Sequence, residues 1–218
     1  MTTLVTTPHL KDESLAGFIQ PKVEGMIDDL ILSLPKVSSL SSEERRGMIA
    51  RYTAVLEGNF IYWMTAALLA VQAEEARPII LDNLNEEVRD AHPAMLRRFA
   101  IAAHAYPTVS DAMTVNDELT SVRVFLGKLS GVQSLVTMAF FEGFIQKFMG
   151  YLADLAQAEG STDMEYTDVH GVCDIAHTQG LFTALGTELE INPLEPGADP
   201  MEGVYLLRGL LQKIVFNN

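Results

Sequence analysis

The segment His170-Gly171-Val172-Cys173-Asp174-Ile175-Ala176-His177 places three potential metal ligands at helical spacing. His170 and Asp174 are four residues apart, and Asp174 and His177 are three apart, so a helix presents these three side chains on one face. Two neutral imidazoles and a carboxylate suit Fe(II), Mn or Zn, and with open coordination positions they suit a metal that activates oxygen or water. The segment predicts a metal-binding helix over about residues 166–185.

Acidic residues within apolar runs supply further potential ligands. Glu57, Glu142 and the pair Glu86 and Glu87 ahead of His92 each lie in or beside such a run, where an unpaired charge is costly and needs a cation. Four helices that each direct Glu, Asp or His inward form the dimetal carboxylate sites of helical bundles. Neither Glu86 nor Glu87 lies neatly on the helical face of His92, so helical spacing does not choose between them. One of the two is expected to bind the metal and the other to be solvated.

Composition and apolar spacing predict one all-α domain over residues 1–218, and the candidate metal ligands, expected in its core, all fall within about 45–185. The chain has 218 residues, of which 48% are hydrophobic, enough to bury a sizeable core. Apolar residues at helical spacing, bounded by Pro, Gly and capping residues, indicate helices over most of the chain. The expected helices cover about 13–34, 41–75, 78–105 with a possible kink at Pro93, 119–158 with weak points at its glycines, 166–185 and 201–215, with a loop over 108–117.

Charge and targeting signals narrow the class of protein. The net charge of −14 excludes nucleic acid as the expected partner, because phosphates demand a basic surface. No apolar run reaches the roughly 18–20 residues that span a bilayer, and Met1–Thr7 lacks the features of a signal peptide. We therefore expect a cytoplasmic protein without membrane association, and a homodimer as the default oligomeric state.

The only cysteine, Cys173, cannot form an intramolecular disulfide. It lies between His170 and Asp174 in the sequence and is expected to point off their helical face, as a small core residue. Four residues elsewhere are expected to form an apolar pocket that excludes water from the site: Met64, Met138, Phe141 and Met149.

Taken together, these residues resemble the haem-oxygenase-like diiron oxidases and oxygenases. The likeness covers about residues 45–185 and rests on the order and spacing of the ligands, most strongly on the last three. It includes the segment Asn83-Leu-Asn-Glu86-Glu87. The segment Glu57-Gly-Asn-Phe-Ile-Tyr-Trp63 looks closest to the small family members that act on amino acids. The resemblance implies a haem-oxygenase-like helical bundle that holds two iron ions with Glu57, Glu86 or Glu87, His92, Glu142, His170, Asp174 and His177.

The same resemblance implies an oxygen-dependent non-haem diiron enzyme, with dioxygen as co-substrate. The expected reaction is the oxidative fragmentation or desaturation of a small amino acid, for example the conversion of a halogenated tryptophan to an indole-3-carbonitrile. Alternatives within the family are an N-oxygenase or an oxidase that fragments fatty acids or lysine. A ferritin-like metal-binding protein is an alternative from another class, and a metal-free protein with the same helical fold is a third.

Overall fold

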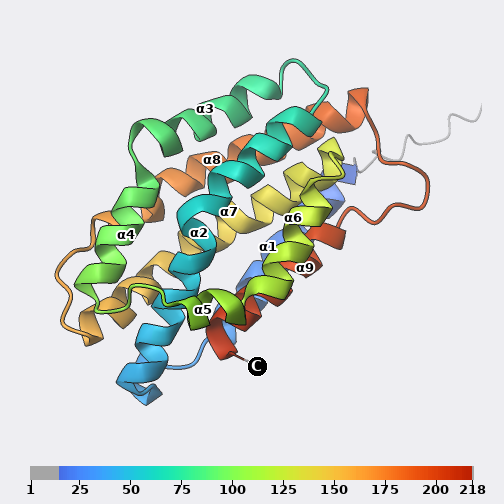
Figure 1. Ribbon diagram of the computed structural model, residues 1–218. Helices are drawn as coiled ribbons and strands as arrows, with labels where there is room; N and C mark the ends of the chain where they lie inside the picture. Colours follow the sequence, from blue (N-terminus) through green and yellow to red (C-terminus); the bar gives the residue numbers. More distant parts are fainter. Residues whose placement is uncertain (1–14, 218) are drawn as a thin grey trace, which may run out of the picture.

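The computed structural model describes residues 15–217, which form nine α-helices and one short 3-10 helix, with no strand in that range (Figure 1). The expected all-α single domain is confirmed for this part of the chain. The helices are α1 (Leu15–Leu32), η1 (Val37–Ser39), α2 (Ser42–Ala70), α3 (Arg77–Arg89), α4 (His92–Ala102), α5 (Val109–Thr114), α6 (Asn116–Leu126), α7 (Gly131–Ala158), α8 (Glu165–Ile191) and α9 (Glu202–Phe216).

The helix α7 runs through the middle of the bundle (Figure 1) and packs against α8, α2, α1 and α9. Every residue over 131–145 is buried, which agrees with a segment that is apolar on nearly all sides. Glu142 is the one acidic residue in this buried stretch and is 1% exposed. The sequence of α7 therefore places a carboxylate in the centre of the molecule.

The helix α2 begins where the sequence predicts and ends earlier. The Ser41 side chain accepts a hydrogen bond from the backbone amide of Glu44, and the Glu44 carboxylate accepts one from the Ser41 amide, which makes a complete capping box. The expected end near residue 75 is wrong, because the chain turns after Ala70. The backbone amides of Gln72 and Ala73 there donate to the buried Glu188 carboxylate, each at 2.9 Å.

Two further boundaries differ from the expected ones. The expected loop over 108–117 contains α5, which begins with a capping box between Thr108 and Asp111. The expected helix over 119–158 is divided into α6 and α7 at Gly127 and Gly131, two of its four expected weak points, and α7 continues through Gly143 and Gly150. Leu129 lies between the two helices with a φ of 56°, a left-handed conformation that ends the regular structure.

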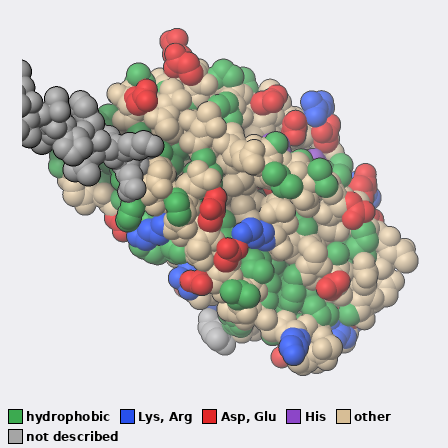
Figure 2. Space-filling model, turned by 180° about the vertical axis from the view of Figure 1, so that it is seen from behind, with side chains coloured by type: hydrophobic (Ala, Val, Ile, Leu, Met, Phe, Trp, Pro, Cys, Tyr) green, Lys and Arg blue, Asp and Glu red, His purple; other side chains and the backbone are tan. Residues whose placement is uncertain are grey.

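Figure 2 shows acidic side chains spread over one face of the molecule, with no single acidic patch. None of the described helices is long and apolar enough to cross a membrane. The expected absence of a signal peptide concerns Met1–Thr7, which lies outside the described residues.

Gly203 provides a test of the packing between α9, α7 and α6. A Cβ atom at this position would lie 2.0 Å from Thr137 Oγ1 and 2.3 Å from Phe125 Cε1. We expect Gly203→Ala to lower the free energy of unfolding in urea by about 1–3 kcal/mol, because the contact overpacks the core. Gly209→Ala in the same helix meets nothing within 4 Å and should raise it by about 0.5–1 kcal/mol. Equal midpoints for the two variants would contradict this packing.

Candidate metal centre

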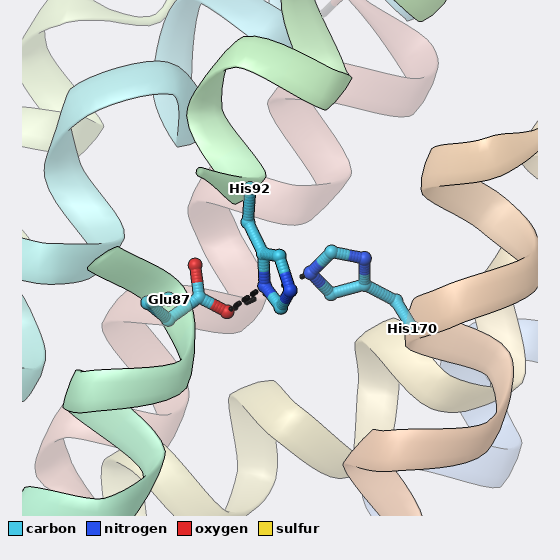
Figure 3. Close-up of side chains that lie close together, drawn as sticks. All are labelled: Glu87, His92 and His170. Atoms are coloured by element: carbon cyan, nitrogen blue, oxygen red, sulfur yellow. Dashed lines mark hydrogen bonds and ion pairs between the residues drawn. The ribbon is translucent and has the colours of Figure 1, made fainter. Parts of the chain in front are cut away.

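The best-formed candidate site consists of Glu87, His92 and His170, here called the inner group. Figure 3 shows the three side chains facing one another from the end of α3, the start of α4 and the second turn of α8. His92 Nδ1 lies 2.7 Å and His170 Nε2 lies 3.6 Å from the same oxygen, Glu87 Oε1. The residues are 5%, 3% and 3% exposed, respectively. A carboxylate and two imidazoles that converge in the core could hold a metal ion.

The corner between α3 and α4 brings Glu87 and His92 together. Five residues along a continuous helix would place two side chains about 140° apart around the axis. The chain instead breaks after Arg89, and Ala91 takes a left-handed conformation with a φ of 55°. Pro93 lies in the first turn of α4, where its missing amide hydrogen costs nothing. The expected kinked helix through Pro93 is therefore wrong, and the break lies before it.

The backbone of α8 orients His170 for ligation. Its Nδ1 lies 2.8 Å from the carbonyl oxygen of Tyr166, one helical turn earlier, and therefore donates the hydrogen bond. This leaves Nε2 unprotonated in the neutral ring and directed at Glu87, the arrangement common in metal-bound histidines. The hydroxyls of Tyr166 and Tyr52 lie 3.0 Å apart, which fixes the ring that packs on His170.

A second set of potential ligands, Cys173, Asp174 and His177, is here called the outer group. Its three donor atoms lie within 4.8 Å of one another on α8. Asp174 is 1% exposed and Cys173 is half-buried. The expectation that Cys173 points away from this face is wrong, because it is three residues after His170 and four before His177, both of which are helical neighbours. The thiol donates to Asp174 Oδ1 at 3.2 Å.

Two glutamates adjoin the outer group. Glu86 Oε2 lies 3.0 Å from His177 Nε2, and Glu142 Oε2 lies 3.8 Å from His177 Nδ1. Asn83 Nδ2 donates to Glu142 Oε1 at 2.6 Å and orients that carboxylate. Glu142 also lines a small internal cavity together with Glu87, His92 and His170, so it adjoins both groups.

The charges around Glu142 are incompletely balanced. Burial and the neighbouring Asp174 raise the pKa of Glu142 to about 7. Burial lowers the pKa of His177, but attraction to the Asp174 and Glu142 carboxylates, 3.5 and 3.8 Å from its Nδ1, outweighs it and raises the pKa to about 11. In the inner group, burial raises the pKa of Glu87, and the interactions with His170 and His92 outweigh it and lower the pKa below its usual value. The acids therefore draw positive charge into the site.

Unpaired polar atoms show that the residues fit a metal ion. Asp174 Oδ2 and His177 Nδ1 are buried, and neither makes a hydrogen bond within the part of the chain that the structure describes. A buried carboxylate oxygen without a donor costs about 1–3 kcal/mol, or more when it is charged. A cation between these atoms would remove this cost, since both are atoms that bind metals.

The structure brings together seven of the eight residues predicted for the site. Glu57 stands apart, because its carboxylate forms an ion pair with Arg97 of α4 and its side chain is 22% exposed. Glu87 is the buried member of the ambiguous pair. Glu86 is partly exposed, with 32% of its side chain accessible, and contacts His177. Both acids of the pair therefore contact a histidine, where only one was expected to do so.

Sequence reasoning missed two contributors and misplaced the pocket. Asn83 is four residues before Glu87, and Cys173 is four before His177, so helical spacing could have found both. The four residues expected to form an apolar pocket are buried in the core, and none lines the small cavity: Met64, Met138, Phe141 and Met149. That cavity instead has apolar walls from Leu56, Phe60, Leu96 and Ile145.

Two spaces adjoin the ligands. The internal cavity between the inner group and Glu142 has about 10 Å³, room for about one water-sized species. A much larger surface hollow of about 660 Å³, here called the α3–α8 hollow, is lined by residues between Pro78 and Glu86 and by Cys173, Ala176 and His177. Of these two spaces, the α3–α8 hollow is the one large enough for an amino acid, and it reaches the outer group.

Comparison of the chain with protein-family models gives no match, and comparison with curated proteins gives none either. The structure itself therefore defines the class, an all-helical protein with a buried His/Glu cluster that could bind metal.

Proposed function

We propose that this protein is an oxygen-dependent non-haem diiron oxidase with a haem-oxygenase-like bundle, acting on a small amino acid. The observation that carries the proposal is the buried inner group, in which Glu87 Oε1 lies 2.7 Å from His92 Nδ1 and 3.6 Å from His170 Nε2. A carboxylate and two histidines from three helices are the ligands that bundle proteins use for iron. The sequence resemblance to the family supports the same assignment.

Two adjacent sets of ligands support a pair of ions. Glu87, His92 and His170 would hold one ion, and Glu86, Asp174 and His177 would hold the other, with Glu142 available to both. Bound ferrous ions supply the electrons that activate dioxygen for oxidation of a carbon–hydrogen bond or a nitrogen of the substrate.

Other groups of the protein would position these ligands and exclude water from the site. The carbonyl of Tyr166 fixes the tautomer of His170, and Asn83 holds Glu142. Leu56, Phe60 and Ile145 give the internal cavity apolar walls, which limits side reactions with water.

The substrate would enter through the α3–α8 hollow. It is large enough for an amino acid, and Asp82 and Asn85 on its wall can accept hydrogen bonds from an ammonium group. Ile79 and Leu81 on the same wall offer apolar contacts to a side chain. Because the segment from Glu57 to Trp63 resembles small family members that act on amino acids, we place aromatic amino acids first. The narrowest form of the proposal is conversion of a halogenated tryptophan to an indole-3-carbonitrile.

Oxygen consumption and product analysis test the proposal. Protein loaded anaerobically with about two Fe(II) per chain is exposed to oxygen with a panel of amino acids, halogenated tryptophans first, and products are identified by mass spectrometry. We expect one small substrate to accelerate oxygen consumption and to yield an oxidised product. His104→Ala, which replaces an exposed histidine outside both groups, should behave like the wild type.

Other outcomes separate the alternatives. Acceleration by lysine or a fatty acid, but by no aromatic amino acid, would retain the diiron assignment and reject aromatic amino acids as the substrates of this pocket. Iron uptake far beyond two ions per chain, with no response to any small molecule, would identify a storage protein and reject the enzyme proposal.

A further inference from the structure

The outer group contains a sulfur atom as well as a carboxylate and an imidazole. Cys173 is four residues before His177 and adjacent to Asp174, and the three donor atoms lie within 4.8 Å of one another. The thiol is directed at the site, since it donates to Asp174 Oδ1 at 3.2 Å. Cys173 therefore lies where a ligand of the second ion would lie.

An independent observation points to a ligand at the same place. Asp174 is 1% exposed, and its second carboxylate oxygen, Oδ2, has no hydrogen-bond partner in the described part of the chain. His177 Nδ1 is also buried without a hydrogen bond there, 3.5 Å from Asp174 Oδ1. The Cys173 thiol donates only to Asp174 Oδ1, which leaves Asp174 Oδ2 and His177 Nδ1 available to a cation.

The outer group is also more accessible to solvent than the inner group. Cys173 and His177 both line the α3–α8 hollow, whereas Glu87, His92 and His170 are each at most 5% exposed. A metal ion can therefore reach Cys173 directly from solution, and the thiol proton can leave by the same path.

We propose that Cys173 is a thiolate ligand of the metal ion held by the outer group, so that this ion has sulfur, oxygen and nitrogen ligands from one face of α8. This inference extends the proposed dimetal site and rests on it. On binding, the S–H bond breaks, a sulfur–metal bond forms and the proton is released to solvent, with no change of oxidation state. Thiolate is a soft ligand, so the outer group should favour Co²⁺ and Zn²⁺ over Mn²⁺ more strongly than the inner group does.

Cobalt binding under anaerobic conditions tests the inference with a direct signal. Co²⁺ is added to the metal-free protein, and the spectrum is recorded for the wild type, Cys173→Ser and His104→Ala. We expect visible cobalt bands in all three proteins. We expect a near-ultraviolet thiolate-to-cobalt charge-transfer band in the wild type and His104→Ala only. Because the chain has one cysteine, this band can come from no other residue.

Two further measurements use the same proteins. Bound Co²⁺ should protect Cys173 from alkylation, and Cys173→Ser should weaken the second cobalt-binding step by at least about tenfold. The affinity of that step for Mn²⁺ should change less, because Mn²⁺ favours oxygen ligands.

The possible failures are distinguishable. Visible cobalt bands without a charge-transfer band, together with unchanged alkylation, would overturn the role of Cys173 and leave the dimetal site standing. The absence of any cobalt binding to the wild type, with Fe(II) also unbound, would overturn both the inference and the proposed function.

Discussion

Replacing Glu87 with glutamine is expected to reduce iron binding from about two ions per chain to about one and to abolish oxidation of the substrate. The amide keeps the shape of the side chain but removes the charge that both His92 and His170 face at Glu87 Oε1. The affinity of the inner group for Fe(II) should fall by more than about 100-fold, because even residues that only support a ligand change metal affinity by about 10–100-fold. Anaerobic titration with iron analysis measures both quantities.

Glu57→Gln is the matched control for this experiment. Glu57 was predicted to be a ligand, but the structure pairs it with Arg97 outside both groups. This variant should bind as much iron as the wild type. Glu86→Gln should have an intermediate effect, because Glu86 is partly exposed and contacts one histidine, His177. If Glu57→Gln loses iron while Glu87→Gln retains it, the assignment of the inner group is wrong.

Metal binding is also expected to stabilise the folded protein strongly. The site holds three acids that are each at most 5% exposed: Glu87, Glu142 and Asp174. An ion that binds only the folded state adds about 4 kcal/mol to the free energy of unfolding when its concentration is about a thousandfold above its Kd. For a chain of this length, about 1 kcal/mol corresponds to about 2–4 °C in Tm, so one tightly bound ion should raise Tm by about 8–16 °C.

Calorimetry of the metal-free protein with and without anaerobic Fe(II) or Mn²⁺ measures this shift. Mg²⁺ is a suitable control ion, because it prefers oxygen ligands and retains its water molecules. It should raise Tm much less. A rise in Tm of the same size in Glu87→Gln would mean that the stabilising ion binds elsewhere. No rise in Tm of the wild type would mean that the folded protein does not bind the metal ion.

The sequence predicted the three ligands on α8 from local spacing alone. His170, Asp174 and His177 belong to one helix, so their relative positions follow from helical geometry alone. Glu142 was predicted because it lies within an apolar run, and such a run is expected in the core. In both cases local sequence determines the three-dimensional position.

Predictions that depended on tertiary contacts were less successful. Glu57 also has apolar neighbours, but Arg97, forty residues later, lies beside it and holds it at the surface. The end of α2 was misplaced for a similar reason. The backbone amides that follow Ala70 donate to Glu188, which is at least 115 residues away in the sequence. Local periodicity carries no information about such distant partners.

The corner at Ala91 gives the two halves of the site different tolerance to changes in chain length. Glu87 and His92 meet across a break between α3 and α4, so the number of residues between them could differ if the two helix axes kept their positions. Inserting one residue between His170 and His177 would instead rotate one ligand by about 100° away from the other. In proteins with the same site, the spacing on α8 should therefore be constant while the spacing across the corner varies.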